Sequence, residues 1–244
     1  MIRTVLVAGA TGQLGSAIAR DLAATGRRVA VHCHSNQVLA DELVDALPGD
    51  GHVVVRVDLG DPTAVDAALA RLVAWGGVDD LVNAAWPSGP ARPAADTDGA
   101  AVDEAMRGVR MHANLVRAAL PGLRRSRGSI VFLGGALSTR LHPGLGLFGA
   151  AKAAATVLTH VTALEEGQAG VRANVISPGR VGVASGDLAE EDPLFASLDE
   201  IGALRRVLPL PSPAEVAATV RWLLAPESSA VTGQTITLAG GERV

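Results

Sequence analysis

The chain has 244 residues, of which 48% are hydrophobic and 19% charged, and its formal net charge at pH 7 is −4. This composition is typical of one compact globular domain and excludes a disordered chain. A slightly acidic chain without a basic stripe gives no reason to expect a nucleic-acid partner. The single cysteine, Cys33, excludes a disulfide within the chain, and we therefore expect a cytoplasmic protein.

Short aliphatic and β-branched runs alternate with helical patterns along the whole chain. We predict strands at residues 4–10, 28–33, 52–59, 80–85, 129–134, 172–177 and 234–240. Apolar residues at helical spacing predict helices at 15–26, 37–47, 62–75, 102–123, 150–167 and 213–225. We expect no signal peptide and no segment long enough to span a membrane.

Repeated strand–helix units imply right-handed crossovers between parallel strands. We therefore predict an α/β fold in which residues 1–244 form a single Rossmann-type domain, a doubly wound parallel sheet flanked by helices. Residues 183–208 interrupt the repetition with an acidic stretch. Long segments of this kind inside compact domains are usually functional, so we expect a lid over a small-molecule substrate.

A glycine turn lies between the first predicted strand and the first predicted helix. Gly9, Gly12 and Gly15, with Thr11 and Leu14 between them, form the spacing that lets backbone N–H groups approach a pyrophosphate at a helix N-terminus. Glycines also serve ordinary turns. Their position in a strand–helix–strand unit favours a dinucleotide site.

The second predicted strand ends in a polar segment without an acid. An NAD site usually has a carboxylate here to hold the ribose 2′-hydroxyl. His34, Ser35 and Asn36 stand there instead, which favours NADP(H) over NAD(H), although the segment holds no arginine to clamp a 2′-phosphate and would equally suit a plain polar loop. His32 and His34 share one face of the strand without a third ligand, so we expect no metal site.

With the glycine turn, the segments "LVNAA", "RANVISPG" and "AVTGQTITLAGG" and Lys152 resemble the short-chain dehydrogenase/reductase family over the whole chain. The resemblance implies hydride transfer between NAD(P) and a small carbonyl or alcohol, and dimers or tetramers built on the two long helices. It implies that Lys152 holds the nicotinamide ribose. The other cofactor contacts that it implies are adenine binding by Asp58 and Leu59, lining of the adenosine side by Asn83 and Ala84, and nicotinamide contacts by Pro178, Gly179 and Val181.

The catalytic positions depart from the family pattern. Phe148 stands in place of the tyrosine, Gly135 in place of the serine, and Arg107 at or beside the asparagine. Only Lys152 remains, and it is the single lysine among 21 basic residues. Trp86 also replaces a glycine that the family keeps close to the cofactor. Phenylalanine keeps the ring of tyrosine but cannot donate a proton, so reduction by the family route should be very weak.

Other side chains are candidate substitutes for the lost acid. Ser138 and His142 follow Gly135 in the same loop, and His112 precedes it on a helix. Arg107 and Lys152 are predicted to face the pocket together as cationic donors. We expect the substrate pocket to be lined by Trp86, Gly135, Phe148 and Phe195.

Three functional hypotheses remain open. The first is an NADP(H)-dependent oxidoreductase with an atypical active site. The second is a non-redox catalyst, namely an isomerase, dehydratase or cyclase, in which no cofactor is turned over. The third is a non-catalytic nucleotide sensor or a partner subunit that associates with an active homologue.

Overall fold

The computed structural model describes residues 2–139, 141–182 and 208–241. Within these ranges, seven parallel strands form one sheet in the order β3-β2-β1-β4-β5-β6-β7. They are β1 (Thr4–Ala8), β2 (Arg28–Cys33), β3 (Val53–Arg56), β4 (Asp80–Asn83), β5 (Ser129–Leu133), β6 (Arg172–Pro178) and β7 (Thr235–Leu238). The predicted α/β fold with a doubly wound parallel sheet is therefore confirmed.

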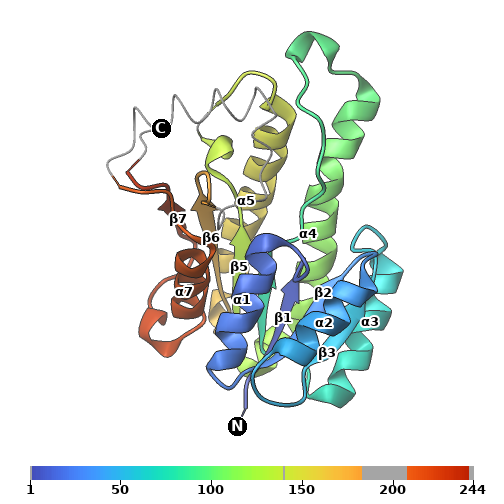
Figure 1. The fold of residues 1–244 in the computed structure, drawn as a ribbon, viewed down its shortest axis with the longest axis vertical. Coiled ribbons are helices and arrows are strands. Elements are labelled where there is room, and N and C mark those ends of the chain that lie inside the picture. Colours follow the sequence, from blue (N-terminus) through green and yellow to red (C-terminus); the bar gives the residue numbers. More distant parts are fainter. Residues whose placement is uncertain (1, 140, 183–207, 242–244) are drawn as a thin grey trace.

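Helices cover both faces of this sheet (Figure 1). They are α1 (Gln13–Ala24), α2 (Gln37–Ala46), α3 (Pro62–Trp75), α4 (Gly99–Ser126), α5 (Gly146–Glu166) and α7 (Pro213–Leu223). The order of strands reverses between β1 and β4, because β2 and β3 lie on one side of β1 while β4 to β7 lie on the other. In open parallel sheets, ligands bind outside the carboxyl ends of the strands at this switch point.

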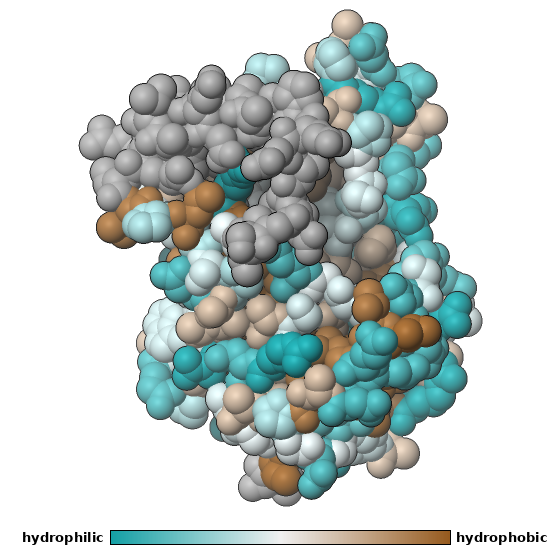
Figure 2. Space-filling view, viewed as in Figure 1, coloured by the Kyte–Doolittle hydropathy of each residue, from teal (hydrophilic) through white to brown (hydrophobic). Residues whose placement is uncertain are grey.

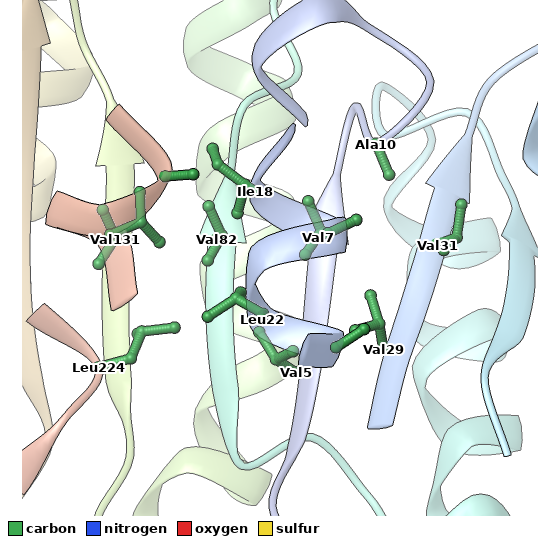
Figure 3. Close-up of a cluster of buried hydrophobic side chains, with 14 of the residues drawn as sticks. Val5, Val7, Ala10, Ile18, Leu22, Val29, Val31, Val82, Val131 and Leu224 are labelled. Atoms are coloured by element: carbon green, nitrogen blue, oxygen red, sulfur yellow. The ribbon is translucent and has the colours of Figure 1, made fainter. Parts of the chain in front are cut away.

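Alternate residues of each strand build two hydrophobic layers. Val5 and Val7 face Ile18 and Leu22 of α1, in a layer that also includes residues of α2 and α7 (Figure 3). Leu6 belongs to the opposite layer, which includes residues of α3, α4 and α5. Both faces of the central strands are thus buried, which explains why the strands read as continuous aliphatic runs. Figure 2 shows hydrophilic residues over much of the lower half of the same view, with hydrophobic residues in smaller groups.

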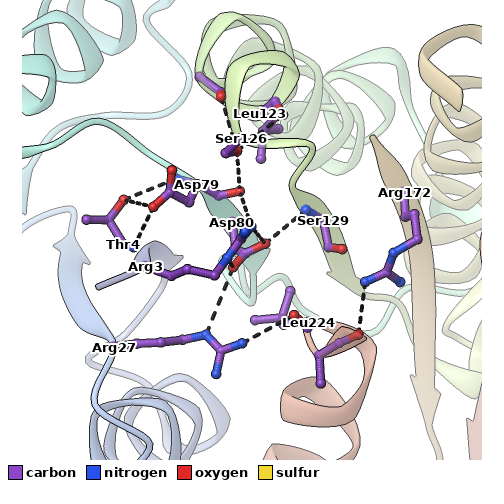
Figure 4. A network of polar contacts seen from close by, with 12 residues as sticks. Arg3, Thr4, Arg27, Asp79, Asp80, Leu123, Ser126, Ser129, Arg172 and Leu224 are labelled. Carbon is purple, nitrogen blue, oxygen red and sulfur yellow. Dashed lines mark hydrogen bonds and ion pairs between the residues drawn. The ribbon is translucent and has the colours of Figure 1, made fainter. Parts of the chain in front are cut away.

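A polar network fixes the amino-terminal edge of the sheet, opposite the switch-point crevice (Figure 4). The buried carboxylate of Asp80 accepts two hydrogen bonds from Arg3, both 3.0 Å, and one of 3.0 Å from the Ser129 backbone N–H. The hydrogen bond and the charge of Asp80 raise the pKa of Arg3. Arg172 donates to the Leu223 carbonyl at 2.8 Å, which ties β6 to α7. A buried carboxylate needs such partners to offset its desolvation.

Several predicted boundaries were wrong by one to four residues, for local reasons. Helix α4 begins at Gly99 rather than 102, because the Asp98 side chain accepts a hydrogen bond of 2.8 Å from the Ala101 N–H. Strand β3 ends at Arg56 rather than 59, since the chain turns at Asp58, whose carboxylate accepts from the Gly60 N–H at 2.8 Å. The predicted lid at 183–208 lies outside the described residues except for Leu208, as does Phe195.

The expectation that no segment is long enough to span a membrane needs correction. Residues Gly146–Ala169 are helical, and by length and composition this segment is long and apolar enough to cross a membrane. The core helix of a soluble protein can have the same length and composition. Helix α5 packs on α4 and β6 along one side, with Lys152 and Glu166 among its buried residues. Its other side exposes apolar residues, namely Val157, Leu158, Val161 and Leu164. The expected oligomer on α4 and α5 stays a prediction.

Candidate nucleotide and substrate site

The glycine turn after β1 is tightly packed against its neighbours. Gly9 has a φ of +74°, and a Cβ there would lie 2.7 Å from the Ala85 backbone nitrogen. A Cβ on Gly15 would overlap the Gly9 carbonyl oxygen. Gly12 has more room, since its Cβ would meet only that oxygen at 3.4 Å. Glycine is therefore required for conformation and space at the first position and for space at the third.

Helix α1 begins directly after this turn with its end open to an anion. Its N-cap is Gly12, which offers no side-chain cap, and no acidic residue stands in the first turn. The first N–H groups of a helix have no partner within it. Together with the positive end of the helix dipole, they suit a phosphate group.

A buried histidine holds the turn in place. His32 lies at the end of β2 and is 3% exposed. Its Nδ1 accepts a hydrogen bond of 2.9 Å from the Gly9 N–H, while its Nε2 lies 3.0 Å from the Val57 carbonyl oxygen. Burial lowers the pKa of His32 to about 4, which keeps the ring neutral and able to accept. The described residues contain no group of three or more metal-ligating side chains.

A cavity of about 270 Å³ opens beside the turn, and seven of the predicted cofactor residues line it. These are Gly9, Thr11, Gly12, His34, Asp58, Leu59 and Ala84. Ser35 is exposed at the end of β2 and does not line it. Asn83 is buried and does not line the cavity. Its side chain accepts a hydrogen bond of 3.0 Å from the Ala85 N–H and contacts His112 at 3.0 Å. Of the remaining residues, Leu14, Gly15, Pro178, Gly179, Val181 and Lys152 do not line this cavity.

Arg107, which the sequence predicts beside Lys152, lines this cavity instead. The Arg107 guanidinium lies 3.2 and 3.3 Å from the two carboxylate oxygens of Asp58. His34 Nε2 lies 3.9 Å from the same carboxylate. The Gly60 N–H, and after it Arg107 and His34, lower the pKa of Asp58. Arg107 is thus paired at the adenosine side rather than grouped with Lys152, which corrects the prediction that the two face the pocket together.

The positions of the missing serine and tyrosine face each other. A Cβ on Gly135 would lie 3.9 Å from the Phe148 ring, with nothing closer. The Phe148 ring lines a second cavity, of about 240 Å³, with Trp86, Pro87, Arg92, Asp98, Glu104, Leu145 and Leu147 also in its wall. This cavity is the candidate substrate pocket, and of the residues predicted to line it Trp86 and Phe148 do so, whereas Gly135 does not.

Lys152 is enclosed rather than open to either cavity. The side chain is 5% exposed, and its Nζ donates a hydrogen bond of 2.8 Å to the Leu133 carbonyl. Three aromatic rings surround the Nζ, with ring centroids at 4.1 Å for Trp86, 5.0 Å for Phe132 and 5.8 Å for Phe148. Burial lowers the pKa of Lys152 to about 7, while the ring faces act in the opposite direction by favouring the ammonium form.

The other candidate acids are bound in local hydrogen bonds. Ser138 Oγ donates to the Gly135 carbonyl at 2.8 Å, and His142 Nδ1 lies 2.7 Å from the Pro143 carbonyl oxygen. Neither residue lines the cavity beside Phe148. His112 is 1% exposed between Asn83 and Thr159, and burial lowers its pKa to about 4. It supports the core and has no access to a substrate.

The family resemblance implies a nicotinamide dinucleotide, and the two ends of the crevice differ in how they suit one. At the adenosine end, the glycine turn, the open end of α1 and the cavity beside Asp58 fit an adenosine diphosphate group. At the nicotinamide end, the ring of Trp86 covers the Lys152 ammonium that would meet the ribose. The residues there do not fit the nicotinamide ribose while Trp86 keeps this position.

Comparison with known proteins agrees with the family resemblance. Residues 9–242 match the family model described as enoyl-(acyl carrier protein) reductase. The 3beta-hydroxysteroid dehydrogenase 1 of Eggerthella lenta is 31% identical over 98% of this chain and 93% of its own length. Dehydrogenase/reductase SDR family member 4 of Bos taurus is 32% identical over 98% and 86%.

Solved structures agree as well. A dehydrogenase/reductase from Sinorhizobium meliloti 1021 superposes with a TM-score of 0.87 at 28% identity, covering 99% of this chain and 95% of that one. A short-chain type dehydrogenase/reductase from Mycobacterium ulcerans gives 0.88 at 27%, covering 98% and 89%. The chain therefore belongs to the short-chain dehydrogenase/reductase family of NAD(P)(H)-dependent oxidoreductases.

Proposed function

We propose that this protein is an NADP(H)-binding oxidoreductase with an atypical active site, which acts on a small carbonyl or alcohol compound. The observation that carries the proposal is the intact adenosine end. Three features lie together at the switch point of the sheet. They are the tightly packed glycines Gly9 and Gly15, the uncapped start of α1 and the cavity beside Asp58.

Preference for NADP(H) follows from the charges around the cavity. His34 and Arg107 both line it, and no acid stands at the end of β2 to bind an unphosphorylated ribose. Asp58 contributes one carboxylate against the two basic side chains, Arg107 at 3.2 Å and His34 at 3.9 Å, so an anion meets a site with more basic than acidic groups. A 2′-phosphate gains charge-assisted hydrogen bonds in such a setting.

The redox step itself lacks the acid of the family. The resemblance assigns proton donation to the position of Phe148 and carbonyl binding to that of Gly135, and neither residue has a polar side chain. Lys152 is the one catalytic residue of the family that this chain keeps. Its Nζ lies 5.8 Å from the Phe148 ring centroid and donates its hydrogen bond to the Leu133 carbonyl. The substrate pocket beside Phe148 is small enough to select a compact molecule with an apolar body.

Calorimetric titration with NADPH and NADH at one salt concentration tests the proposal. We expect NADPH to bind about tenfold more tightly, the equivalent of one charge-assisted hydrogen bond. His34→Ala should reduce this preference, whereas His160→Ala, a histidine that contacts Thr235 away from the cavity, should not. Equal affinities, or no binding of either nucleotide, contradict the proposal.

A second candidate is a nucleotide sensor or non-catalytic partner subunit, and the enclosed Lys152 favours it. A lysine hydrogen-bonded to a main-chain carbonyl beneath three rings is not poised for turnover. This candidate predicts NADPH binding without reduction of any carbonyl compound, and co-purification with a tyrosine-bearing homologue. Turnover of a carbonyl compound with NADPH by the isolated protein excludes it.

A further inference from the structure

Trp86 separates the two cavities of the crevice. Its ring lines both the adenosine-side cavity and the cavity beside Phe148, and the neighbouring Pro87 also belongs to both walls. A dinucleotide that extends from one cavity towards the other has to pass this side chain. Trp86 follows β4 at the switch point, where the resemblance has a glycine.

Three contacts hold the indole in this position. Gly108 of α4 lies against it so closely that a Cβ there would stand 2.6 Å from the ring, which means that the glycine makes the slot. Phe132 packs on it with centroids 5.7 Å apart. The Lys152 ammonium lies 4.1 Å from its centroid. The indole is therefore packed from three sides rather than loosely placed.

The same contacts use up the donors of Lys152. One N–H of the ammonium is bound to the Leu133 carbonyl, and the rest of the group faces aromatic rings. A ribose that approaches Lys152 meets the carbon atoms of aromatic rings instead of the N–H groups that would bind its hydroxyls. Contacts at the adenosine end do not involve this group, because Lys152 does not line that cavity.

We infer that Trp86 divides the nucleotide site, so that the site as built takes an adenosine diphosphate group and the nicotinamide half adds almost no affinity until the indole leaves Lys152. The inference rests on the nucleotide binding proposed above. It names Trp86 as the residue that determines which part of the dinucleotide is recognised. The ligand class is an adenosine 5′-diphosphate nucleotide, with or without a nicotinamide.

The test compares NADP⁺ with 2′-phospho-ADP, which carries the same phosphates but neither the second ribose nor the nicotinamide, by calorimetry. In the wild-type protein we expect the two affinities to agree within about fivefold. In Trp86→Gly, NADP⁺ should bind at least about tenfold more tightly than 2′-phospho-ADP, whose own affinity should stay unchanged because it has no second ribose to reach Lys152. Trp222→Ala, which removes a partly exposed tryptophan on α7, is the matched control and should behave as wild type.

The outcomes separate the inference from the proposed function. Wild-type binding of NADP⁺ more than about fivefold tighter than that of 2′-phospho-ADP overturns the inference and leaves the proposed function standing. A folded Trp86→Gly variant with an unchanged affinity ratio overturns it as well. Failure of both nucleotides to bind the wild type removes the proposed function itself. The wild-type comparison needs no variant, so it decides the question even where Trp86→Gly does not fold.

Discussion

In the Trp86→Gly background, where the indole no longer covers Lys152, replacing Phe148 by tyrosine and Gly135 by serine together is expected to raise the rate of NADPH-dependent carbonyl reduction by about 10²-fold or more, because a general acid contributes 10²–10⁴-fold and an oxyanion donor a similar factor. The site has room for both side chains. Gly135 has an extended φ of 174°, which any residue adopts, and its Cβ direction is open to 3.9 Å. The tyrosine ring would occupy the present position of Phe148.

The measurement is steady-state kcat/KM for a small diketone, 2,3-butanedione, followed by the absorbance of NADPH. Gly135→Ser alone is the control, since it adds a hydroxyl without the acid. The double substitution is also made with Trp86 in place, where the indole still covers Lys152 and a smaller gain is expected. A folded, nucleotide-binding protein that gains no activity in either background contradicts the assignment of Phe148 and Gly135 to the catalytic positions.

Lys152→Met is expected to stabilise the protein most strongly below neutral pH. The folded-state pKa of Lys152 is about 7, and the ordinary value of a lysine in an unfolded chain is about 10.4. Between these values the unfolded chain holds a proton that the folded chain has lost, so the stability of the wild type rises with pH through this window. Below pH 7 both states are charged, and the full cost of burying the ammonium remains.

Urea unfolding at pH 6.5 and 9.0 measures this effect. The advantage of Lys152→Met over wild type should shrink by about 2–3 kcal/mol between the two pH values, at about 1.4 kcal/mol per unit of pKa difference. The lost contacts to the Leu133 carbonyl and the rings lower the advantage at both pH values but not the difference between them. An advantage that does not change with pH shows that Lys152 remains charged in the folded protein throughout this range.

The fold was predictable because its signals are local. Strands such as β1 and β5 are buried on both faces and consist almost wholly of aliphatic or aromatic residues, so their pattern needs no knowledge of their neighbours. The ends of helices and strands are less predictable, since they depend on hydrogen bonds such as the one that the Ala101 N–H donates to the Asp98 carboxylate at the start of α4. The glycine turn was recognisable from spacing alone, and the clashes that a Cβ would make at Gly9 and Gly15 explain why.

The arrangement of the site depended on contacts that spacing does not reveal. The sequence predicts Arg107 near Lys152, but α4 carries it to Asp58. Asp58 follows β3, whereas Lys152 bonds to Leu133 of β5, four positions away in the sheet order. Trp86 in place of a family glycine indicates a reshaped pocket, but it does not show where the indole lies. The position of the indole depends on Gly108, whose missing side chain leaves the space that the ring fills. No feature of the sequence near Trp86 points to Gly108.

The enclosure of Lys152 beneath Trp86 is tested most directly by amine labelling of the tag-free protein. Lys152 is the only lysine, so acetylation by an N-hydroxysuccinimide ester followed by intact mass measurement counts it separately from the α-amine. We expect one acetyl group on the native wild type, and two on Trp86→Gly and on the wild type unfolded in urea. A second acetyl group that appears on the native wild type as fast as on the unfolded chain would contradict the closed arrangement.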